Sequence, residues 1–336
     1  MAVQESWSPA LLHAIHDVAD DVRLFEFVPE DGALPYRVGS HLDVQVMVDG
    51  KPEVRSFSLV GDGSASTTYR IAVKNRADGH GGSRYLWSLE PGARLQTSAP
   101  KDMFALAYGS PEYLLIAGGI GITPLFGMAL ALARKGSRLR LLYAARQASQ
   151  LAFEDELRAS LGDRLQIFVG ERGERIDPAH EIEGLADDAE LYICGPLSLR
   201  EDFQRAWAAA GRDASRLRFE TFASSGRHPA EEFEVEVANH DLRLTVAADQ
   251  SLLQALIDNG VDDVLYDCEH GECGLCSVKV LQCDGEIDHR DVFYSERQHQ
   301  ELGGQRICTC VSRVVNGSLV IDTSQQLVDT GHFAEG

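Results

Sequence analysis

The sequence of 336 residues contains no apolar run long enough to cross a bilayer, which takes about 20 residues in a helix. It also has few basic residues: 31 Lys and Arg stand against 52 Asp and Glu, giving a formal net charge of −21. This deficit excludes the basic surface that nucleic-acid binding needs. The N-terminus has no basic segment followed by an apolar one, so no secretory signal is evident and we expect a cytoplasmic protein. The remaining composition, 44% hydrophobic, is that of a soluble protein with two or three domains.

The acidic charge is concentrated toward the C-terminus. From Glu231 onward the sequence has 21 acidic and 6 basic residues, a net charge of −15. Such a surface is either simply solvated or a docking face for a protein partner, where complementary charge mainly raises the association rate.

The first 107 residues are predicted to form antiparallel β structure, in a barrel or a sandwich. Apolar side chains alternate with polar or small ones over residues 42–48 and 69–73, as expected for half-buried strands. Turn-forming clusters separate these strands, and no long helical pattern lies between them.

Residues 108–223 have a different pattern, in which continuous apolar runs alternate with helical stretches. Such runs are typical of strands buried on both faces, and their alternation with helices predicts an α/β domain with a doubly wound parallel sheet. The runs are Tyr113–Ala117, 139–143, 165–169, 191–194 and 217–219.

A short segment, residues 224–230, has the composition of a linker. The β pattern then returns in residues 231–336, first at 233–237 and then at 242–246. A helix is expected from about Ser251 to Asn259, with Gly260 as its terminator.

Six of the seven cysteines lie within Cys268–Cys310, which in a cytoplasmic chain favours metal binding over disulfides. Cys268, Cys273 and Cys276 have the C-x4-C-x2-C spacing of a plant-type [2Fe–2S] site, and a fourth cysteine follows much later. Zinc ribbons, the main alternative, normally use two separated C-x2-C pairs. The sequence therefore predicts an iron–sulfur cluster.

The fourth ligand is either Cys308 or Cys310. We favour Cys310, because plant-type ferredoxins typically place the last cysteine directly before a strand that contains valine, as in Cys310-Val311. Cys283 has no assigned role.

A second motif, Gly118-Gly119-Ile120-Gly121-Ile122-Thr123-Pro124, follows the strand at residues 113–117. Glycines at a strand-to-helix turn let a pyrophosphate approach the backbone and the helix N-terminus. Cys194-Gly195-Pro196 ends a later strand of the same sheet, and ligands bind at the carboxyl ends of such strands. Together the two segments predict a nucleotide site.

A third motif, Arg55-Ser56-Phe57-Ser58, lies in the first domain. A guanidinium suits a phosphate, an aromatic ring can stack on a flavin, and a hydroxyl can hydrogen-bond its edge. Residues 79–83 add a Gly-rich backbone and the hydroxyl of Ser83. These segments predict a flavin site.

Taken together, the three motifs resemble those of the phthalate dioxygenase reductase family over essentially the whole chain. The resemblance implies a flavin-binding barrel, a nicotinamide domain and a C-terminal ferredoxin domain of the β-grasp type, in a monomer. It also implies FMN, NADH and a [2Fe–2S] cluster as cofactors. Phe57 stands where tyrosine is commoner, which keeps ring stacking but loses a hydroxyl contact.

The resemblance assigns site residues one by one. Thr123 and Cys194 are expected at the site of hydride transfer. The expected cofactor-binding residues are Arg55, Phe57, Ser58, Gly81, Gly82, Ser83, Gly118, Gly119, Gly121, Thr123, Gly195, Pro196 and Phe222, and the expected cluster ligands are Cys268, Cys273, Cys276 and Cys310.

The expected function is that of an oxygenase reductase, which passes electrons from NADH through FMN and the cluster to a Rieske-type oxygenase, as in aromatic degradation. A diaphorase-type enzyme and a ferredoxin-like carrier are the alternatives. Arg146 follows the second parallel strand, where it could meet the 2′-phosphate of NADPH. His270 and His289 lack the spacing of a two-His, one-carboxylate iron site, so we expect no such site in this chain.

Overall fold

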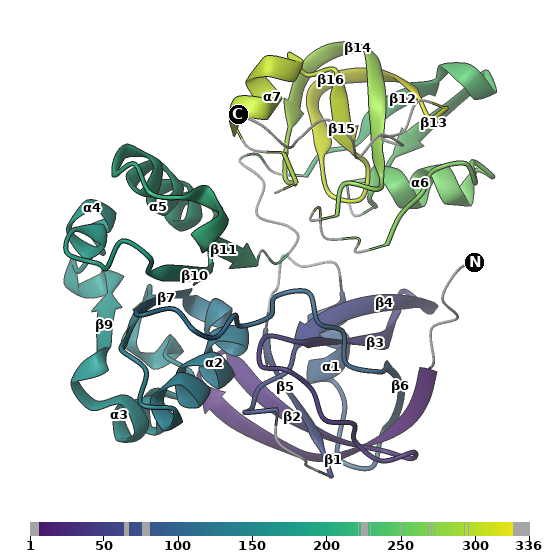
Figure 1. The fold of residues 1–336 in the computed structure, drawn as a ribbon. Helices are drawn as coiled ribbons and strands as arrows, with labels where there is room; N and C mark the ends of the chain where they lie inside the picture. Colours follow the sequence, from purple (N-terminus) through teal and green to yellow (C-terminus); the bar gives the residue numbers. More distant parts are fainter. Residues whose placement is uncertain are drawn as a thin grey trace. The chain divides into compact units, whose positions relative to one another are not determined.

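The computed structural model describes residues 7–63, 67–75, 81–220, 222, 228, 230–248, 250–267, 269, 271, 273–291, 293–294 and 296–324, with the backbone alone at 296, 297 and 300. These residues form two compact units, 1–220 and 221–336. The first unit contains two sheets and the second contains one (Figure 1).

The N-terminal sheet is antiparallel and has the strand order β4-β3-β6-β1-β2-β5. Its edges are joined where Leu59, directly after β4, forms a bridge to Ile71 of β5, which closes the sheet into the expected barrel. Leu42, Val44 and Val46 of β3 are fully buried inside it. The strands are β1 (Trp7–Ala19), β2 (Val22–Pro29), β3 (His41–Val48), β4 (Lys51–Ser58), β5 (Tyr69–Lys74) and β6 (Arg94–Ser98), and the one helix among the described residues of this domain is α1 (Gly82–Trp87).

The second sheet is wholly parallel, with the order β11-β10-β7-β8-β9. Every residue of β7 is buried, which explains the continuous apolar run in the sequence. The strands are β7 (Tyr113–Gly118), β8 (Leu139–Ala145), β9 (Leu165–Val169), β10 (Glu190–Cys194) and β11 (Leu217–Glu220). The helices are α2 (Ile122–Arg134), α3 (Glu154–Leu161), α4 (Pro178–Ile182) and α5 (Leu197–Ala209).

The strand order reverses between β7 and β10, because β7 lies in the middle of the sheet and is followed by β8 on one side and β10 on the other. At such a switch point, the loops that follow the two strands leave in opposite directions and a crevice opens between them. The loops that begin at Gly118 and Gly195 therefore lie where a nucleotide is expected.

Helix α2 is held against the barrel by a close backbone approach. A Cβ atom at Gly127 would lie 1.9 Å from the carbonyl oxygen of Gly61, so only glycine fits there. Arg134, at the end of α2, forms an ion pair with Asp62. These contacts fix the turn before α2 relative to the barrel.

The third sheet is mixed, with the order β13-β12-β16-β14-β15, and only β12 and β16 are parallel. The Ser251 side chain caps α6 by accepting the Gln254 N–H at 3.1 Å, and Gly260 follows with φ 79°. The strands are β12 (Phe233–Val237), β13 (Leu242–Val246), β14 (Ser277–Asp288), β15 (Arg306–Cys308) and β16 (Arg313–Asp322), and the helices are α6 (Leu252–Asp258) and α7 (Glu296–Leu302).

The expected fold class is thereby confirmed in all three parts. Within the described residues, no helix is both long enough and apolar enough to span a membrane.

Candidate functional site

Arg55 lies on β4, with its guanidinium beside two groups of its own strand. It forms an ion pair with Glu53 and donates to the Val54 carbonyl oxygen at 2.8 Å. The side chain is about one-third exposed, so a solvent-borne anion can reach it. Any phosphate that binds Arg55 competes with the Glu53 carboxylate for the same guanidinium.

The Gly-rich segment of the second flavin motif packs directly against Arg55. Gly81 has φ 82° and caps the N-terminus of α1, a conformation that favours glycine. A Cβ at Gly82 would lie 2.7 Å from Cγ of Arg55, so glycine lets the backbone of the turn lie against this side chain. The turn at Gly82 and the Arg55 side chain, 27 residues apart in the sequence, thus lie in contact. Gly79 lies outside the described residues.

Ser58, at the end of β4, links the barrel to the parallel sheet. Its hydroxyl is buried and donates to the carboxylate of Glu220, at the end of β11, at 3.3 Å. Phe57 is half-buried and packs against the barrel core. The end of β4, the strand that carries the predicted flavin motif, therefore lies beside the carboxyl end of a strand of the parallel sheet. Nucleotides bind at the carboxyl ends of such strands in this fold class. Phe222, the other expected aromatic, is half-buried in the second unit.

The turn between β7 and α2 requires glycine for two different physical reasons. A Cβ at Gly118 would lie 2.5 Å from Cδ of Pro196, and one at Gly121 would lie 2.1 Å from the Cys194 carbonyl oxygen. These two allow the turn to pack on the loop after β10. Gly119 has φ 55°, and no atom lies within 4 Å of its Cβ position, so the space beside this residue of the turn is empty.

Thr123 and Cys194 lie near this contact and are both buried. The Thr123 hydroxyl donates to the Ile120 carbonyl oxygen at 3.0 Å, which holds it within the first turn of α2. Cys194 pairs with Ala117 across the β10–β7 ladder, so it lies beside the start of the Gly-rich turn. A Cβ at Gly195 would lie 3.0 Å from Cα of Gly118. Arg146, directly after β8, is exposed.

Replacing Gly121 by alanine is expected to lower the free energy of unfolding of the first unit by roughly 1–3 kcal/mol, because the new methyl group meets backbone rather than a flexible side chain. Urea denaturation followed by circular dichroism measures this. Gly170→Ala is the matched control, since its Cβ would meet nothing closer than 3.5 Å. Equal stabilities of the two variants would contradict the packing role of Gly121.

Two cysteines of the second unit, Cys308 and Cys310, lie close to Cys276. Its sulfur lies 3.3 Å from that of Cys310, and Cys308 is close by in the same buried core. Hydrogen bonding with the thiols of Cys308 and Cys310 lowers the pKa of Cys276 below its usual value, which favours the thiolate that binds iron. This sulfur-rich pocket fits the expected cluster. Cys268 lies outside the described residues.

The cluster loop needs glycine at two positions. Gly271 has φ 76°, and its Cβ would lie 2.8 Å from Cα of Asp291. Gly274 has φ 71°, and its Cβ would lie 2.4 Å from the ring of Phe293. Asp291 and Phe293 therefore pack closely against the loop that carries Cys273 and Cys276.

The fourth ligand is not decided by proximity. Cys308 ends β15 opposite Ser277 and is fully buried, whereas Cys310 lies in the following turn and is 8% exposed. The Cys276 carbonyl oxygen accepts from both the amide and the hydroxyl of Thr309, the residue between them. Both candidates thus lie beside Cys276, and the preference for Cys310 stays a prediction.

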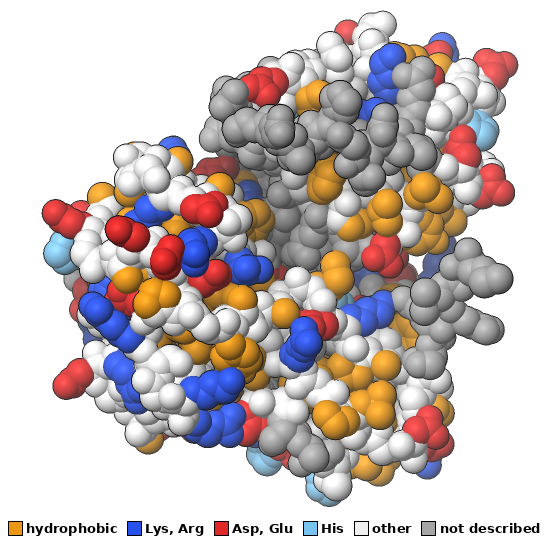
Figure 2. Space-filling view, in the orientation of Figure 1, with side chains coloured by type: hydrophobic (Ala, Val, Ile, Leu, Met, Phe, Trp, Pro, Cys, Tyr) orange, Lys and Arg blue, Asp and Glu red, His pale blue; other side chains and the backbone are white. Residues whose placement is uncertain are grey.

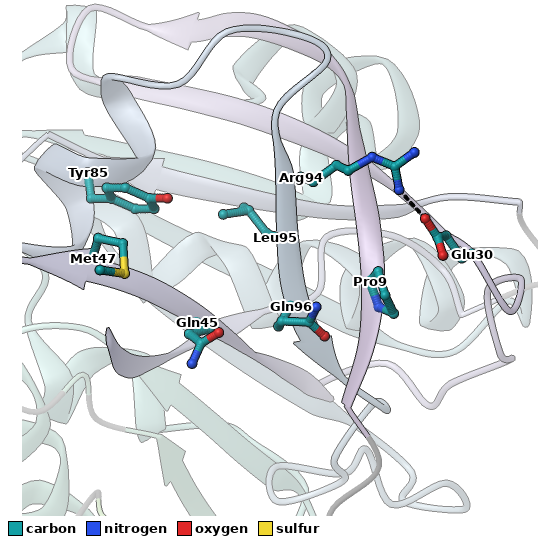
Figure 3. Close-up of a pocket in the computed structure, with 8 residues that line it drawn as sticks. All are labelled: Pro9, Glu30, Gln45, Met47, Tyr85, Arg94, Leu95 and Gln96. Atoms are coloured by element: carbon teal, nitrogen blue, oxygen red, sulfur yellow. Dashed lines mark hydrogen bonds and ion pairs between the residues drawn. The ribbon is translucent and has the colours of Figure 1, made fainter. Parts of the chain in front are cut away.

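A pocket of about 430 Å³ lies on the outside of the barrel (Figure 3). Gln45 and Met47 belong to the face of β3 that points away from the core, and an ion pair between Arg94 and Glu30 borders the pocket. None of the expected flavin residues lines it. Its lining residues are Pro9, Glu30, Gln45, Met47, Tyr85, Arg94, Leu95 and Gln96.

One group of side chains in the second unit was not anticipated from the sequence. His289, Asp291 and His299 come together with their ligand atoms within 4.8 Å of one another, so the second unit does hold two histidines and a carboxylate in one place. The sequence does not reveal this group of side chains, because His299 lies ten residues after His289 and comes close to it only through the folding of α7. The close pair His289 and Asp291 was the only signal.

Comparison with known protein families divides the chain into three domains, which correspond to the three sheets of the fold. An oxidoreductase FAD-binding domain matches residues 9–106, an oxidoreductase NAD-binding domain matches 115–205, and a 2Fe–2S iron-sulfur cluster binding domain matches 235–315.

Similar proteins match along nearly their whole length. The β subunit of a haem-dependent oxidative N-demethylase from Ectopseudomonas mendocina is 36% identical over 92% of this chain and 96% of its own. A vanillate O-demethylase oxidoreductase from Acinetobacter baylyi is 31% identical over 93% and 98%. The solved structure of phthalate dioxygenase reductase, titled as modular for electron transfer from pyridine nucleotides to [2Fe–2S], is 28% identical, with a TM-score of 0.75 over 94% of this chain and 98% of that one.

Fold, site and comparisons define an iron–sulfur flavoprotein oxidoreductase with separate flavin, nicotinamide and cluster domains. The chain belongs to the phthalate dioxygenase reductase family. It is a reductase of the kind that serves oxygenase systems, and a flavin, a nicotinamide nucleotide and a [2Fe–2S] cluster are confirmed as its classes of cofactor.

Proposed function

We propose that this chain takes electrons from NADH where β4 meets the carboxyl ends of the parallel sheet, and delivers them through its cluster to a Rieske-type oxygenase. The main support for this proposal is the hydrogen bond from Ser58 to Glu220, because it joins β4, which contains the flavin motif, to β11 of the parallel sheet. We further propose that the chain works as a monomer in the cytoplasm, with domain boundaries at residues 107, 223 and 231.

Each side chain has a defined task in this proposal. Arg55, Gly81, Gly82 and Ser83 hold the FMN phosphate, since a guanidinium and a Gly-rich helix start form charge-assisted hydrogen bonds to an anion. Phe57 and Ser58 orient the flavin ring, and the role of Phe222 stays a prediction from the sequence motif alone.

The turn that contains Gly118, Gly119 and Gly121 holds NADH together with Gly195 and Pro196, so that the nicotinamide lies near Thr123 and Cys194. Cys268, Cys273, Cys276 and Cys310 hold the iron. When bound, NADH supplies a hydride, FMN receives two electrons and releases them singly, and the cluster accepts one at a time. The protein's own contribution is to position these groups and to keep water away from them, and buried Ser58 and Thr123 suit that role.

Coupled turnover with the oxygenase is expected to slow as the salt concentration rises from about 0.05 to about 0.5 M. The reason is that the third domain carries a net charge of −15, and the Debye length falls from about 14 Å to about 4 Å over this range. On the face in Figure 2, acidic side chains lie around the rim of this domain. Ferricyanide reduction by NADH, which needs no docking, is the control and is expected to change much less.

A haem-dependent oxygenase is the second candidate partner, because a relative 36% identical to this chain is named as a subunit of a haem-dependent N-demethylase. Reconstitution with one purified oxygenase of each kind distinguishes the two. Product formation with a Rieske-type oxygenase and NADH is the expected result. Coupling with the haem enzyme alone would contradict the proposed partner, and oxygenation by the chain without any partner would contradict the proposed function.

A further inference from the structure

Three side chains with metal-binding groups converge behind the cluster loop of the second unit. His289 follows β14, Asp291 lies two residues later, and His299 is on α7. One ligand atom from each lies within 4.8 Å of the other two. Nδ1 of His289 is 3.8 Å from Oδ1 of Asp291, and Nε2 of His299 is 3.3 Å from Oδ2.

The two ring nitrogens that face the carboxylate are buried. Both face the Asp291 carboxylate within ion-pair distance, but neither forms a well-aligned hydrogen bond among the residues that the structure describes. Buried polar atoms nearly always have a partner, so two orphaned nitrogens aimed at one carboxylate need an explanation. The imidazole rings are stacked, with centroids 3.7 Å apart and an interplanar angle of 28°.

The carboxylate of Asp291 is fixed from behind and has no exposed surface. The Ser312 hydroxyl donates to Oδ1 at 3.0 Å, and the Tyr294 amide donates to Oδ2 at 3.2 Å. Outer partners of this kind orient the carboxylate ligands of metal sites. They are neutral, however, so a buried negative charge still needs a positive group beside it.

We propose that His289, Asp291 and His299 form a binding site for a divalent transition-metal ion such as zinc. Zinc binds nitrogen and oxygen at about 2.0–2.2 Å, which puts tetrahedral ligand atoms about 3.4 Å apart. The two nitrogen-to-carboxylate distances, 3.8 and 3.3 Å, bracket this value, so small shifts of the two rings would complete the site. His289 and His299 are 19% and 15% exposed, which leaves a path for the ion and for a water as fourth ligand.

The rival explanation is an imidazolium ion paired with Asp291. In that arrangement one charged ring and one neutral ring would each direct an N–H at the carboxylate, with the two rings stacked at 3.7 Å. A single divalent cation serves both nitrogens and the carboxylate at once. This geometry favours the metal.

The site would brace the cluster loop. The Phe293 amide donates to the Gly271 carbonyl oxygen at 3.0 Å, and Gly271 lies tightly against Asp291. A cation that ties α7 to Asp291 would therefore stiffen the wall behind Cys273 and Cys276. This inference depends on the second unit alone and stands whether or not the proposed partner is correct.

Zinc chloride titrated calorimetrically into the chelator-washed holoprotein tests the proposal, with iron content checked so that no cluster thiolate is vacant. We expect one zinc per chain, and at least tenfold weaker binding in His299→Gln and, as a second variant, in His289→Gln. His240→Gln is the matched control, because His240 lies 3.0 Å from Asp263 in the same unit but belongs to no such trio in the described residues. It should bind as the unchanged protein does.

X-ray absorption at the zinc edge gives a second readout that needs no variant. Nitrogen and oxygen ligands without sulfur are expected. Sulfur ligands, zinc binding weaker than about 0.1 mM, or equal affinity of His299→Gln and the unchanged protein would each overturn the site.

Discussion

Cys310→Ser is expected to remove the [2Fe–2S] cluster, and Cys308→Ser to leave it in place. A cluster iron needs two thiolates, and a serine hydroxyl at Cys310 would leave one iron short of a strong ligand. Cys308, which is fully buried in the apolar core, would instead pay the usual cost of a buried hydroxyl, roughly 1–3 kcal/mol of stability. Iron analysis and electron paramagnetic resonance of the dithionite-reduced variants measure both effects.

Cys283→Ser serves as the control for these variants, since Cys283 lies on β14 away from the turn that holds Cys310. It should keep full iron content. Loss of iron in Cys308→Ser with retention in Cys310→Ser would show that the ligand assignment is reversed.

Arg55→Ala is expected to lose FMN while the cluster remains assembled. A charge-assisted bond from the guanidinium to the phosphate is worth about 1.5–3 kcal/mol, so the flavin affinity should fall by roughly tenfold to a hundredfold or more. Flavin content after gel filtration and the dissociation constant from fluorescence titration provide the measurement.

Two further variants sharpen this test. Arg37→Ala removes an arginine that is 78% exposed, and it should retain FMN. Glu53→Gln should bind FMN as tightly as the unchanged protein or more tightly, because it removes the carboxylate that competes for Arg55. Unaltered flavin binding in Arg55→Ala would place the phosphate elsewhere.

The fold was largely predictable because the apolar pattern is strong where strands are buried on both faces. The run at residues 113–117 matches β7, and 242–246 matches β13. Strand β1 was not located, since it is mostly half-exposed and its register shifts twice, between Leu12 and Ala14 and between Asp17 and Ala19. An irregular strand of this kind gives no clean alternation.

The site was predictable as a set of motifs but not as a set of contacts. The glycines at 118 and 121 were interpreted as making room for pyrophosphate, whereas their Cβ positions are filled by Pro196 and Cys194. The Glu53 carboxylate beside Arg55 and the trio around Asp291 depend on side-chain geometry. Contacts of this kind depend on how the secondary-structure elements pack, so no periodic pattern in the sequence predicts them.

The order of electron transfer can be tested most directly by adding NADH anaerobically to cluster-loaded Arg55→Ala protein that has been freed of flavin. We expect the cluster to stay oxidised, as followed by its visible absorbance and its paramagnetic signal, and excess FMN to restore its reduction. The unchanged protein should reduce its cluster without added flavin. Rapid reduction of the cluster by NADH in the flavin-free protein would contradict the path from nicotinamide through flavin to iron.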